Sequence, residues 1–267
     1  MGSAVAAEKI TAVERPFVDT ASPSSAKLVI LIDDMGHSLS LNIAALNLPG
    51  ALSFAFLPHT SHSKKLAKIA QASGKDVLLH APMENIYNLP LGRGAMTSSM
   101  SEADFKSTLE KNIAAIPSLI GVNNHMGSKL TALNLQMRWT MEVVKEKGLF
   151  FLDSKTTSKS VAWQQAKNAG IAGLKRDIFL DHDLNLTAIN RQYQRAIALA
   201  KRRGYAVVIA HPHAITIKFL QQRLGQLKAQ NVQLVSVSAM INQLKVQHIS
   251  LGELNKSLNK SRILPVR

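Results

Sequence analysis

The sequence predicts an α/β fold in which parallel strands form a closed or nearly closed barrel inside a layer of helices. Its length of 267 residues is typical of one such barrel. Short apolar runs alternate with longer amphipathic stretches, which indicates parallel strands joined by right-handed helical crossovers. The runs are continuously apolar, as strands buried on both faces are. Seven or eight such units favour a barrel, and an open doubly wound sheet is the alternative.

The predicted elements follow from these runs and from the stretches between them. The runs are rich in Val, Ile, Leu and Phe and too short for helices, so we expect strands at 28–32, 52–57, 77–79, 119–122, 149–152, 171–174, 206–210 and 232–237. We expect helices at 39–47, 62–73, 101–115, 133–147, 159–168, 187–203 and 216–229. Ser101, followed three residues later by Asp104, predicts a helix start. Gly204 directly follows the helical stretch 187–203, at the position where a residue in the left-handed conformation commonly ends a helix.

The chain divides into a barrel domain at 27–245, a flexible arm at 1–26 and a basic tail at 246–267. Met1-Gly2-Ser3 resembles an expression leader. Ala4-Val5-Ala6-Ala7 resembles the small-residue end of a signal-peptide cleavage region whose apolar part is missing. We therefore expect a periplasmic or otherwise exported protein without its signal peptide. An Ala-rich disordered start is the alternative.

The overall charge is strongly basic, with a formal net charge of +15 and a pI of about 10.1. Such a balance suits anionic partners, including acidic envelope polymers. The basic residues lie in short clusters without a nucleic-acid-binding motif, so we expect solvated helix faces and no nucleic-acid partner. The absence of cysteine excludes disulfides and thiolate metal sites. No apolar run is long enough to span a membrane, and the sequence does not indicate an oligomeric state.

Residues that can bind metals or transfer protons follow most of the predicted strands. They are Asp33 and Asp34, His59, His80 to Glu84, Asn123 to Ser128, Asp153, Arg176, and His211 to His213. Nine histidines are present, and five of them stand just beyond a predicted strand. Catalytic and ligand-binding residues in α/β barrels and sheets lie mostly at the carboxyl ends of the strands. The pattern therefore predicts a site at that end.

The adjacent carboxylates of Asp33 and Asp34 predict a divalent metal, because paired acids beside a buried strand repel each other unless a cation is near. One Asp would bind the metal and the other would act as a base. Asp34, His80 and His125 would supply the three ligands that a catalytic zinc needs, and cobalt, nickel or manganese also suit such donors. The alternatives are an Asp pair that caps the next helix, and histidines with structural hydrogen bonds.

Five further residues are candidates for supporting roles. His211 suits a general acid near the metal, and His213 would point the same way if the segment stays extended. Asp153 could orient an imidazole. Arg176 could hold a carboxylate by a bidentate pair, although an ion pair or turn within its own segment is equally open. Glu84, four residues after His80, could be a further ligand.

Five motifs in order resemble the divergent polysaccharide deacetylase family of Gram-negative envelopes, which is related to carbohydrate esterase family four. They are Ile32-Asp33-Asp34-Met35-Gly36, Leu79-His80-Ala81-Pro82-Met83-Glu84, Asn123-Asn124-His125-Met126-Gly127-Ser128, Phe151-Leu152-Asp153-Ser154 and Ala210-His211-Pro212-His213. The likeness covers roughly residues 27–245. It implies a distorted seven-stranded (β/α) barrel of the glycoside hydrolase/deacetylase type.

The resemblance also implies roles for individual residues. Classical deacetylases bind a divalent metal through the second Asp of the first motif and two histidines spaced His-x-x-x-His. By position Asp33 matches the base, Asp34 the metal Asp, His80 the first metal His and His211 the acid.

The sequence departs from the classical pattern at two places. Glu84 stands at the position of the second metal His, and Asn124-His125-Met126-Gly127 replaces the usual Arg-x-Pro-aromatic segment. His125 as third ligand is therefore an inference from this sequence and not from the family.

The expected function is metal-dependent hydrolysis of N-acetyl groups on an envelope glycan, such as a polysaccharide or a peptidoglycan-like polymer. The first alternative is a non-catalytic glycan-binding or adaptor protein on the same barrel. The second is a different metal hydrolase, such as an esterase or a phosphoesterase.

Overall fold

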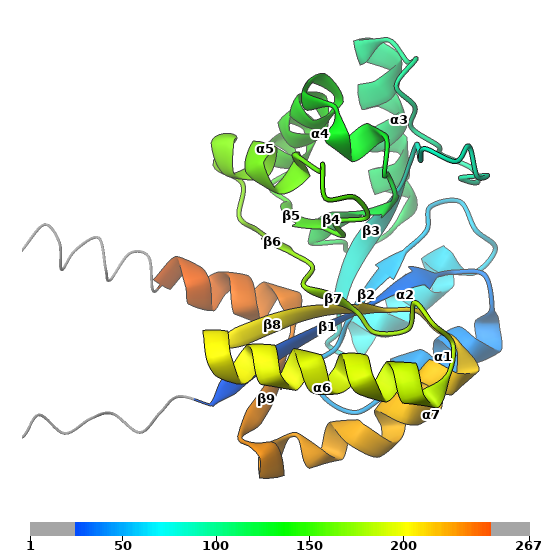
Figure 1. The fold of residues 1–267 in the computed structure, drawn as a ribbon. Helices are drawn as coiled ribbons and strands as arrows, with labels where there is room; N and C mark the ends of the chain where they lie inside the picture. Colours follow the sequence, from blue (N-terminus) through cyan, green and yellow to red (C-terminus); the bar gives the residue numbers. More distant parts are fainter. Residues whose placement is uncertain (1–24, 247–267) are drawn as a thin grey trace, which may run out of the picture.

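The computed structural model describes residues 25–246, which form a curled parallel sheet surrounded by helices (Figure 1). The strands are β1 (Ala26–Met35), β2 (Ser53–Phe56), β3 (Asp76–Met83), β4 (Gly121–Met126), β5 (Phe150–Asp153), β6 (Gly173–Lys175), β7 (Ile178–Phe179), β8 (Tyr205–Ala210) and β9 (Val232–Val235). The α-helices are α1 (Leu39–Leu46), α2 (Ser63–Ala72), α3 (Glu102–Ala115), α4 (Asn134–Glu146), α5 (Ala162–Asn168), α6 (Leu186–Arg203) and α7 (Ala214–Arg223). Short 3₁₀ turns are η1 (Leu130–Ala132), η2 (Leu224–Gln226) and η3 (Lys228–Gln230).

The predicted elements are confirmed, with shifts of a few residues at their ends. Ser101 caps α3 by accepting a hydrogen bond from the Asp104 backbone N–H at 3.2 Å, as expected. Gly204 ends α6 in the left-handed conformation with φ of 90°. The last predicted helix is shorter than expected, because it changes to 3₁₀ turns at Leu224.

The strand order is β6-β5-β4-β3-β2-β1-β8-β7, and β9 pairs with β1 outside this order. All pairings are parallel. The long strand β1 pairs with β8 along one edge. Its other edge pairs first with β9, from Ala26 to Val29, and then with β2, from Leu31 to Met35. β1 is therefore the central strand, and its carboxyl end extends into the site.

The two edge strands of the sheet are neighbours in the chain, because only Arg176 and Asp177 separate β6 from β7. The Arg176 N–H donates to the Asp153 carbonyl in β5, and the Asp177 N–H donates to the Val207 carbonyl in β8, both at 2.9 Å. The sheet consequently curls into a barrel whose edge strands are joined by the chain itself and not by strand pairing. The predicted barrel class is confirmed, with nine strands in the described part of the chain where the resemblance implied seven.

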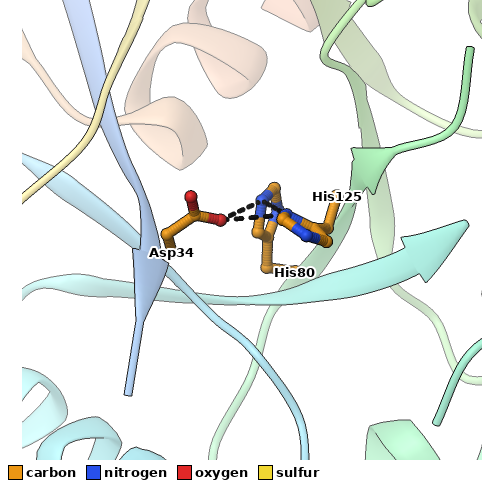
Figure 2. Close-up of side chains that lie close together, drawn as sticks. All are labelled: Asp34, His80 and His125. Atoms are coloured by element: carbon orange, nitrogen blue, oxygen red, sulfur yellow. Dashed lines mark hydrogen bonds and ion pairs between the residues drawn. The ribbon is translucent and has the colours of Figure 1, made fainter. Parts of the chain in front are cut away.

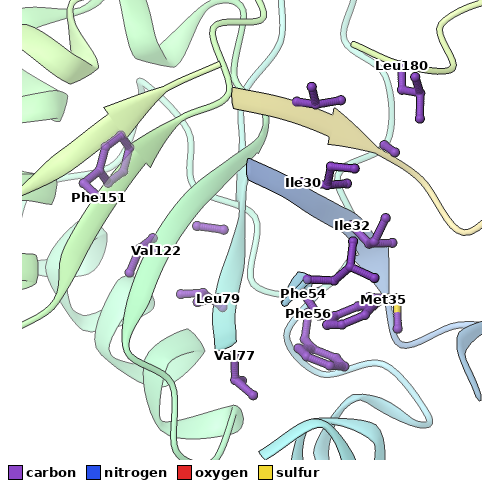
Figure 3. Close-up of a cluster of buried hydrophobic side chains, with 14 of the residues drawn as sticks. Ile30, Ile32, Met35, Phe54, Phe56, Val77, Leu79, Val122, Phe151 and Leu180 are labelled. Atoms are coloured by element: carbon purple, nitrogen blue, oxygen red, sulfur yellow. The ribbon is translucent and has the colours of Figure 1, made fainter. Parts of the chain in front are cut away.

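Both faces of the sheet are buried, as the continuously apolar runs predict. Alternate residues of β1 enter different apolar clusters: Leu28, Ile30 and Ile32 face the surrounding helices, whereas Val29 and Leu31 face the inside of the barrel. Figure 3 shows part of the outer cluster, in which side chains from several neighbouring strands gather on one face of the sheet.

Residues 237–246 form a helix. The sequence analysis placed Val237 at the end of the last strand and predicted no helix in this segment. The start of this helix is held by two residues at the amino ends of the strands. The Val237 N–H donates to Ser53 Oγ at 2.9 Å, and the Ser238 N–H donates to Asp76 Oδ2 at 2.8 Å. Val237 and Ile241 belong to the inner apolar cluster, so the helix covers that end of the barrel interior.

The predicted arm at 1–26 and the tail at 246–267 fall almost entirely outside the described residues and stay predictions. Within residues 25–246, no helix has the length and apolar character needed to cross a membrane.

Candidate metal centre

The first site motif lies at an irregular end of β1. The register with β2 shifts between Ile32 and Met35, and Asp34 adopts a left-handed backbone conformation with φ of 56°. Asp tolerates this conformation better than most residues because its short polar side chain bonds locally. In a regular strand the side chains of Asp33 and Asp34 would leave on opposite faces. The bend lets both carboxylates reach the same site.

Three candidate ligand atoms converge there, one from each of three strands (Figure 2). Asp34 Oδ1 lies 3.1 Å from His80 Nε2 and 2.9 Å from His125 Nδ1. The two imidazole nitrogens are 3.1 Å apart. Atoms that bind one metal at about 2.0–2.2 Å lie roughly 2.8 to 3.6 Å from each other at coordination angles of about 90 to 110°. The three predicted ligands therefore have the mutual spacing of ligands on one ion.

The register of β3 and β4 explains why the histidines meet. His125 is opposite Pro82, two residues beyond His80, so both imidazoles project to the same side of the sheet. Asn123 is directly opposite His80, and its Oδ1 lies 3.0 Å from His80 Nδ1. A side-chain carbonyl oxygen only accepts hydrogen bonds, so Nδ1 carries a proton and donates it. In the neutral imidazole, Nε2 then presents a lone pair to the centre of the triad.

The chemistry of these donors fits a divalent metal. Asp34 Oδ1 is buried and accepts no hydrogen bond, although the two imidazole nitrogens lie beside it. A buried, unsatisfied carboxylate oxygen is costly unless a cation compensates for it. Two nitrogens and one oxygen, without sulfur, form a ligand set typical of zinc and also suited to cobalt, nickel or manganese.

The charges in the triad are strongly coupled. Burial raises the pKa of Asp34, but the neighbouring His125 and His80 outweigh this and hold that pKa well below its usual range. Burial lowers the pKa of His80, but the negative charges of Asp33 and Asp34 beside it raise it above its ordinary value. Burial lowers the pKa of His125.

Asp33 is buried beside the triad and is held by one amide. Asn123 Nδ2 donates to both carboxylate oxygens, at 2.9 and 3.0 Å, and lies 3.1 Å from Ser154 Oγ. Asp33 Oδ2 is 3.6 Å from His80 Nε2, too far for a direct hydrogen bond. Burial raises the pKa of Asp33 to about 6, and the charges of His80 and His211 oppose that rise. Asp33 could therefore accept a proton, and it does not belong to the group of three converging ligand atoms.

His211 follows β8 and is oriented by Asp181, a residue that the sequence analysis missed. Asp181 Oδ1 lies 2.9 Å from His211 Nδ1, and its Oδ2 accepts hydrogen bonds from the His211 N–H and from Thr216 Oγ1. Burial lowers the pKa of His211, but the hydrogen bond and charge of Asp181 outweigh it and raise the pKa to about 9. The imidazole is therefore protonated at neutral pH, as a general acid must be.

Arg176 binds backbone carbonyls and not a carboxylate, to which the sequence analysis suggested a bidentate pair. Its Nε and Nη2 donate to the Ser154 and Lys155 carbonyls at 2.6 Å, which holds the loop after β5. Its guanidinium carbon lies 3.7 Å from the centre of the Phe179 ring, which in turn stacks on His211 with ring centres 6.0 Å apart. Arg176 thus supports the site through packing and through backbone contacts.

The other supporting candidates lie near the site but bind other partners. Asp153 accepts hydrogen bonds from Lys155 N, Ser160 Oγ and Trp163 N, so it organises a loop instead of orienting an imidazole. Glu84 pairs with Lys129 Nζ at 2.7 Å and accepts a hydrogen bond from Ser98 N, which leaves it outside the triad. His213 lies beside His211, with ring centres 6.0 Å apart, and is exposed.

Comparison with known families assigns the chain to one of them. The profile of the divergent polysaccharide deacetylase family matches residues 30–241, and the chain belongs to that family. It is 36% identical over 217 residues to the uncharacterized protein YibQ of Escherichia coli (strain K12), a match that covers 81% of this chain and 68% of YibQ.

Solved structures show the same fold at low sequence identity. An uncharacterized protein of Agrobacterium tumefaciens C58 is similar, with a TM-score of 0.78, 21% identity and coverage of 83% of this chain and 92% of that one. The peptidoglycan deacetylase PdaC of Bacillus subtilis gives a TM-score of 0.52, with 13% identity and coverage of 89% and 99%. A mutant pseudoenzyme of carbohydrate esterase family four, described as having restored enzymatic activity, gives 0.51, with 12% identity and coverage of 82% and 69%.

Proposed function

We propose that this protein hydrolyses N-acetyl groups on an anionic glycan of the cell envelope, with the aid of a divalent metal. The observation that carries the proposal is the triad of Asp34, His80 and His125 together with two groups suited to proton transfer. Asp33 can accept a proton, and His211 can donate one. These two residues are near enough for the charge of each to shift the pKa of the other.

Each residue then has a distinct role in amide hydrolysis. Asp34, His80 and His125 would hold the metal, for which zinc is our first choice. When bound, the metal supplies polarisation of the amide carbonyl and a lower pKa for water. Asp33 takes the proton from the attacking water, and His211 gives a proton to the leaving amine. Asp181 keeps the His211 ring oriented and charged for that transfer.

The proposed substrate follows from the net charge of the chain, from an exposed aromatic residue in the loop after β3 and from the family. A net charge of +15 favours an anionic polymer. Tyr87, with 75% of its surface exposed, lies in the loop after β3. In that loop the Ile86 N–H donates to Ser128 Oγ, three residues from His125. An exposed aromatic ring in such a loop offers apolar surface that a sugar ring can cover. An envelope substrate also requires export, which we include in the proposal.

The test is acetate release from N-acetylated oligosaccharides and peptidoglycan fragments by protein loaded with zinc, cobalt or nickel. We expect slow release that disappears in Asp33→Asn and His211→Ala, while both variants keep their metal. Removal of a positioned base or acid typically reduces the rate on the order of a hundredfold or more. Release that is equally fast in both variants would show that the turnover does not come from this site.

The second candidate is a glycan-binding protein without turnover. Its specific support is Glu84, which stands where classical deacetylases have their second metal histidine and is bound to Lys129. The wild-type form of the Bacillus anthracis protein, described as a pseudoenzyme of carbohydrate esterase family four, has a similar fold with a TM-score of 0.50. Binding of glycan fragments by metal-loaded protein with no acetate release from any of them would favour this candidate.

A further inference from the structure

A cavity of about 750 Å³ opens between β6 and the start of β8, two strands that do not pair with each other. It lies between β6, the start of β8 and the helix at 237–246. Figure 1 shows this helix on the same side of the molecule as the start of β8. Asp34, His80 and His125 lie in the carboxyl-terminal parts of β1, β3 and β4, toward the opposite end of the strands. The cavity is therefore separate from the site described above.

The floor of the cavity is apolar and continues into the barrel interior. Leu174 and Ile241 line the cavity and also belong to the inner apolar cluster, against which Leu244 packs. Ile171 and the Trp163 side chain complete this surface. The gap between β6 and β8 thus leads from solvent toward the apolar inside of the barrel.

The rim of the cavity is basic. Lys167, Lys175 and Lys245 line it, and none of them has an ion-pair partner among residues 25–246. Lys167 Nζ and Lys175 Nζ lie 4.6 and 4.5 Å from the centre of the Trp163 ring. Two ammonium groups over one indole place their positive charge at the mouth of an apolar cavity.

The remaining charged groups at the rim neutralise each other and cover the edge of β8. Arg203 Nη1 donates to Asp177 Oδ1 at 2.8 Å, and Asp177 Oδ2 accepts a hydrogen bond from the Val207 N–H at 2.8 Å. Arg203 Nε donates to the Tyr205 carbonyl at 3.1 Å. An added peptide strand would find these backbone groups on β8 already occupied. The edge therefore does not favour a peptide as the occupant.

We propose that this cavity binds an anionic amphiphile with one alkyl chain and a phosphate or carboxylate head. The chain enters between β6 and β8 and contacts Leu174, Ile241 and Leu244. The head group stays at the mouth, where the three lysines provide the charge that complements it. This inference does not depend on the proposed deacetylase activity, because no residue of the metal centre lines the cavity.

The tryptophans make the binding directly measurable. The chain has two tryptophans, and Trp139 is buried elsewhere, so Trp139→Phe leaves Trp163 as the reporter inside the cavity. The probe is dodecyl phosphate, titrated below the concentration at which it forms micelles. We expect a saturable fluorescence change with one site per chain. Octyl, decyl and dodecyl phosphates should bind about fourfold more tightly for each added methylene until the cavity is full.

Matched charge reversals separate the cavity from the general basic charge. Lys167→Glu combined with Lys175→Glu should weaken binding of dodecyl phosphate by about tenfold or more. Lys64→Glu combined with Lys65→Glu, two exposed lysines on α2, makes the same change in net charge and should have little effect. Leu244→Arg should abolish binding while leaving the metal content unchanged. Equal weakening by the two lysine pairs would show adsorption to a basic surface and would overturn the proposal.

Two further experiments distinguish a free amphiphile from a membrane lipid, and control ligands test other modes of binding. Decanoate binding in solution supports a free amphiphile. Flotation with phosphatidylglycerol vesicles that is lost in Leu244→Arg supports a chain drawn from a membrane. Either result supports the proposal. Binding of dodecyltrimethylammonium as tight as that of dodecyl phosphate, no dependence on chain length, or a response only to an acidic peptide would each overturn it.

Discussion

Asn123 lies opposite His80 in the parallel register of β3 and β4, and its side-chain oxygen is 3.0 Å from Nδ1 of that imidazole. The same amide donates to both carboxylate oxygens of Asp33. One buried side chain therefore fixes the tautomer of a proposed metal ligand and the position of the proposed base. Asn123 directly precedes the segment that replaces the classical Arg-x-Pro-aromatic pattern, so it helps to explain how the site keeps its geometry despite that change.

We predict that Asn123→Ala weakens metal binding by about ten- to a hundredfold, because the His80 ring loses the partner that sets its tautomer. Isothermal titration with zinc measures the effect. Asn112→Ala is the matched control: this asparagine is also fully buried but bonds to His59 and to the Gly94 carbonyl in another part of the molecule. It should lose stability and retain metal affinity. Equal zinc affinity in the two variants would remove Asn123 from the metal centre.

The two adjacent aspartates should respond differently to substitution. Asp34→Ala removes a ligand and should weaken metal binding by at least about tenfold, and His80→Ala and His125→Ala should behave in the same way. Asp33→Asn is nearly isosteric and should keep the metal. Metal content after dialysis, measured by mass spectrometry, distinguishes these results.

Glu84→Gln is the control for this series, since the Glu84 carboxylate binds Lys129 and Ser98 instead of the triad. It should retain the metal with only a small change in stability. If Asp33→Asn loses metal while Asp34→Ala retains it, the roles of the two aspartates are reversed. If none of the substitutions changes metal content, the pair acts as a structural cap and not as a site.

Asp76 should be important for stability although it lies far from the metal centre. It accepts hydrogen bonds from the Ser238 N–H and Ser238 Oγ at the start of the helix at 237–246, and also one from Ser53 Oγ. Asp76→Ala should reduce the free energy of unfolding by about 1–2 kcal/mol, as the loss of a helix cap does. Urea denaturation measures the loss. Asp104→Ala, which leaves the Ser101 cap of α3 in place, should cost less, and the opposite order would contradict this assignment.

The barrel could be predicted from the sequence because most of its strands contain a short apolar run, such as Leu28–Ile32 in β1 and 206–210 in β8, and these runs alternate with helical stretches. The strand β7 was missed because it has only two residues, Ile178 and Phe179. That omission also concealed Asp181, which follows the apolar Leu180 as a strand-end residue just as Asp33 follows Ile32. The spacing of Val237, Met240, Ile241 and Leu244 is that of a helix, but the apolar run before it suggested a longer strand.

The triad itself could be predicted, whereas the partners of the supporting residues could not. Asp34, His80 and His125 all lie in the carboxyl-terminal part of a strand, and parallel strands bring these ends together. The contacts of Asp153, Arg176 and Glu84 depend on the course of loops, for which the sequence has no periodic signal. The sequence analysis placed Asn123 in a motif but gave it no role, because nothing in the sequence indicates its hydrogen bonds to His80 and Asp33. Only the register with His80 shows its role.

The pair of His211 and Asp181 should make stability depend on pH in a defined direction. The pKa of His211 is raised to about 9 in the folded protein, against a reference near 6.5 for an unfolded chain. A raised pKa means that the folded state holds the proton more tightly, so the added stability is complete below pH about 6.5 and is lost as the pH rises through about 9. Asp181→Asn should therefore cost on the order of 1 to 3 kcal/mol more at pH 6 than at pH 10. Thr216→Val is the control, because it removes a hydrogen bond to the same carboxylate without changing a charge, and its cost should not vary with pH. Urea denaturation of the three proteins at both pH values measures the effect, and an Asp181→Asn cost that is constant or grows with pH would show that Asp181 does not hold the proton on His211.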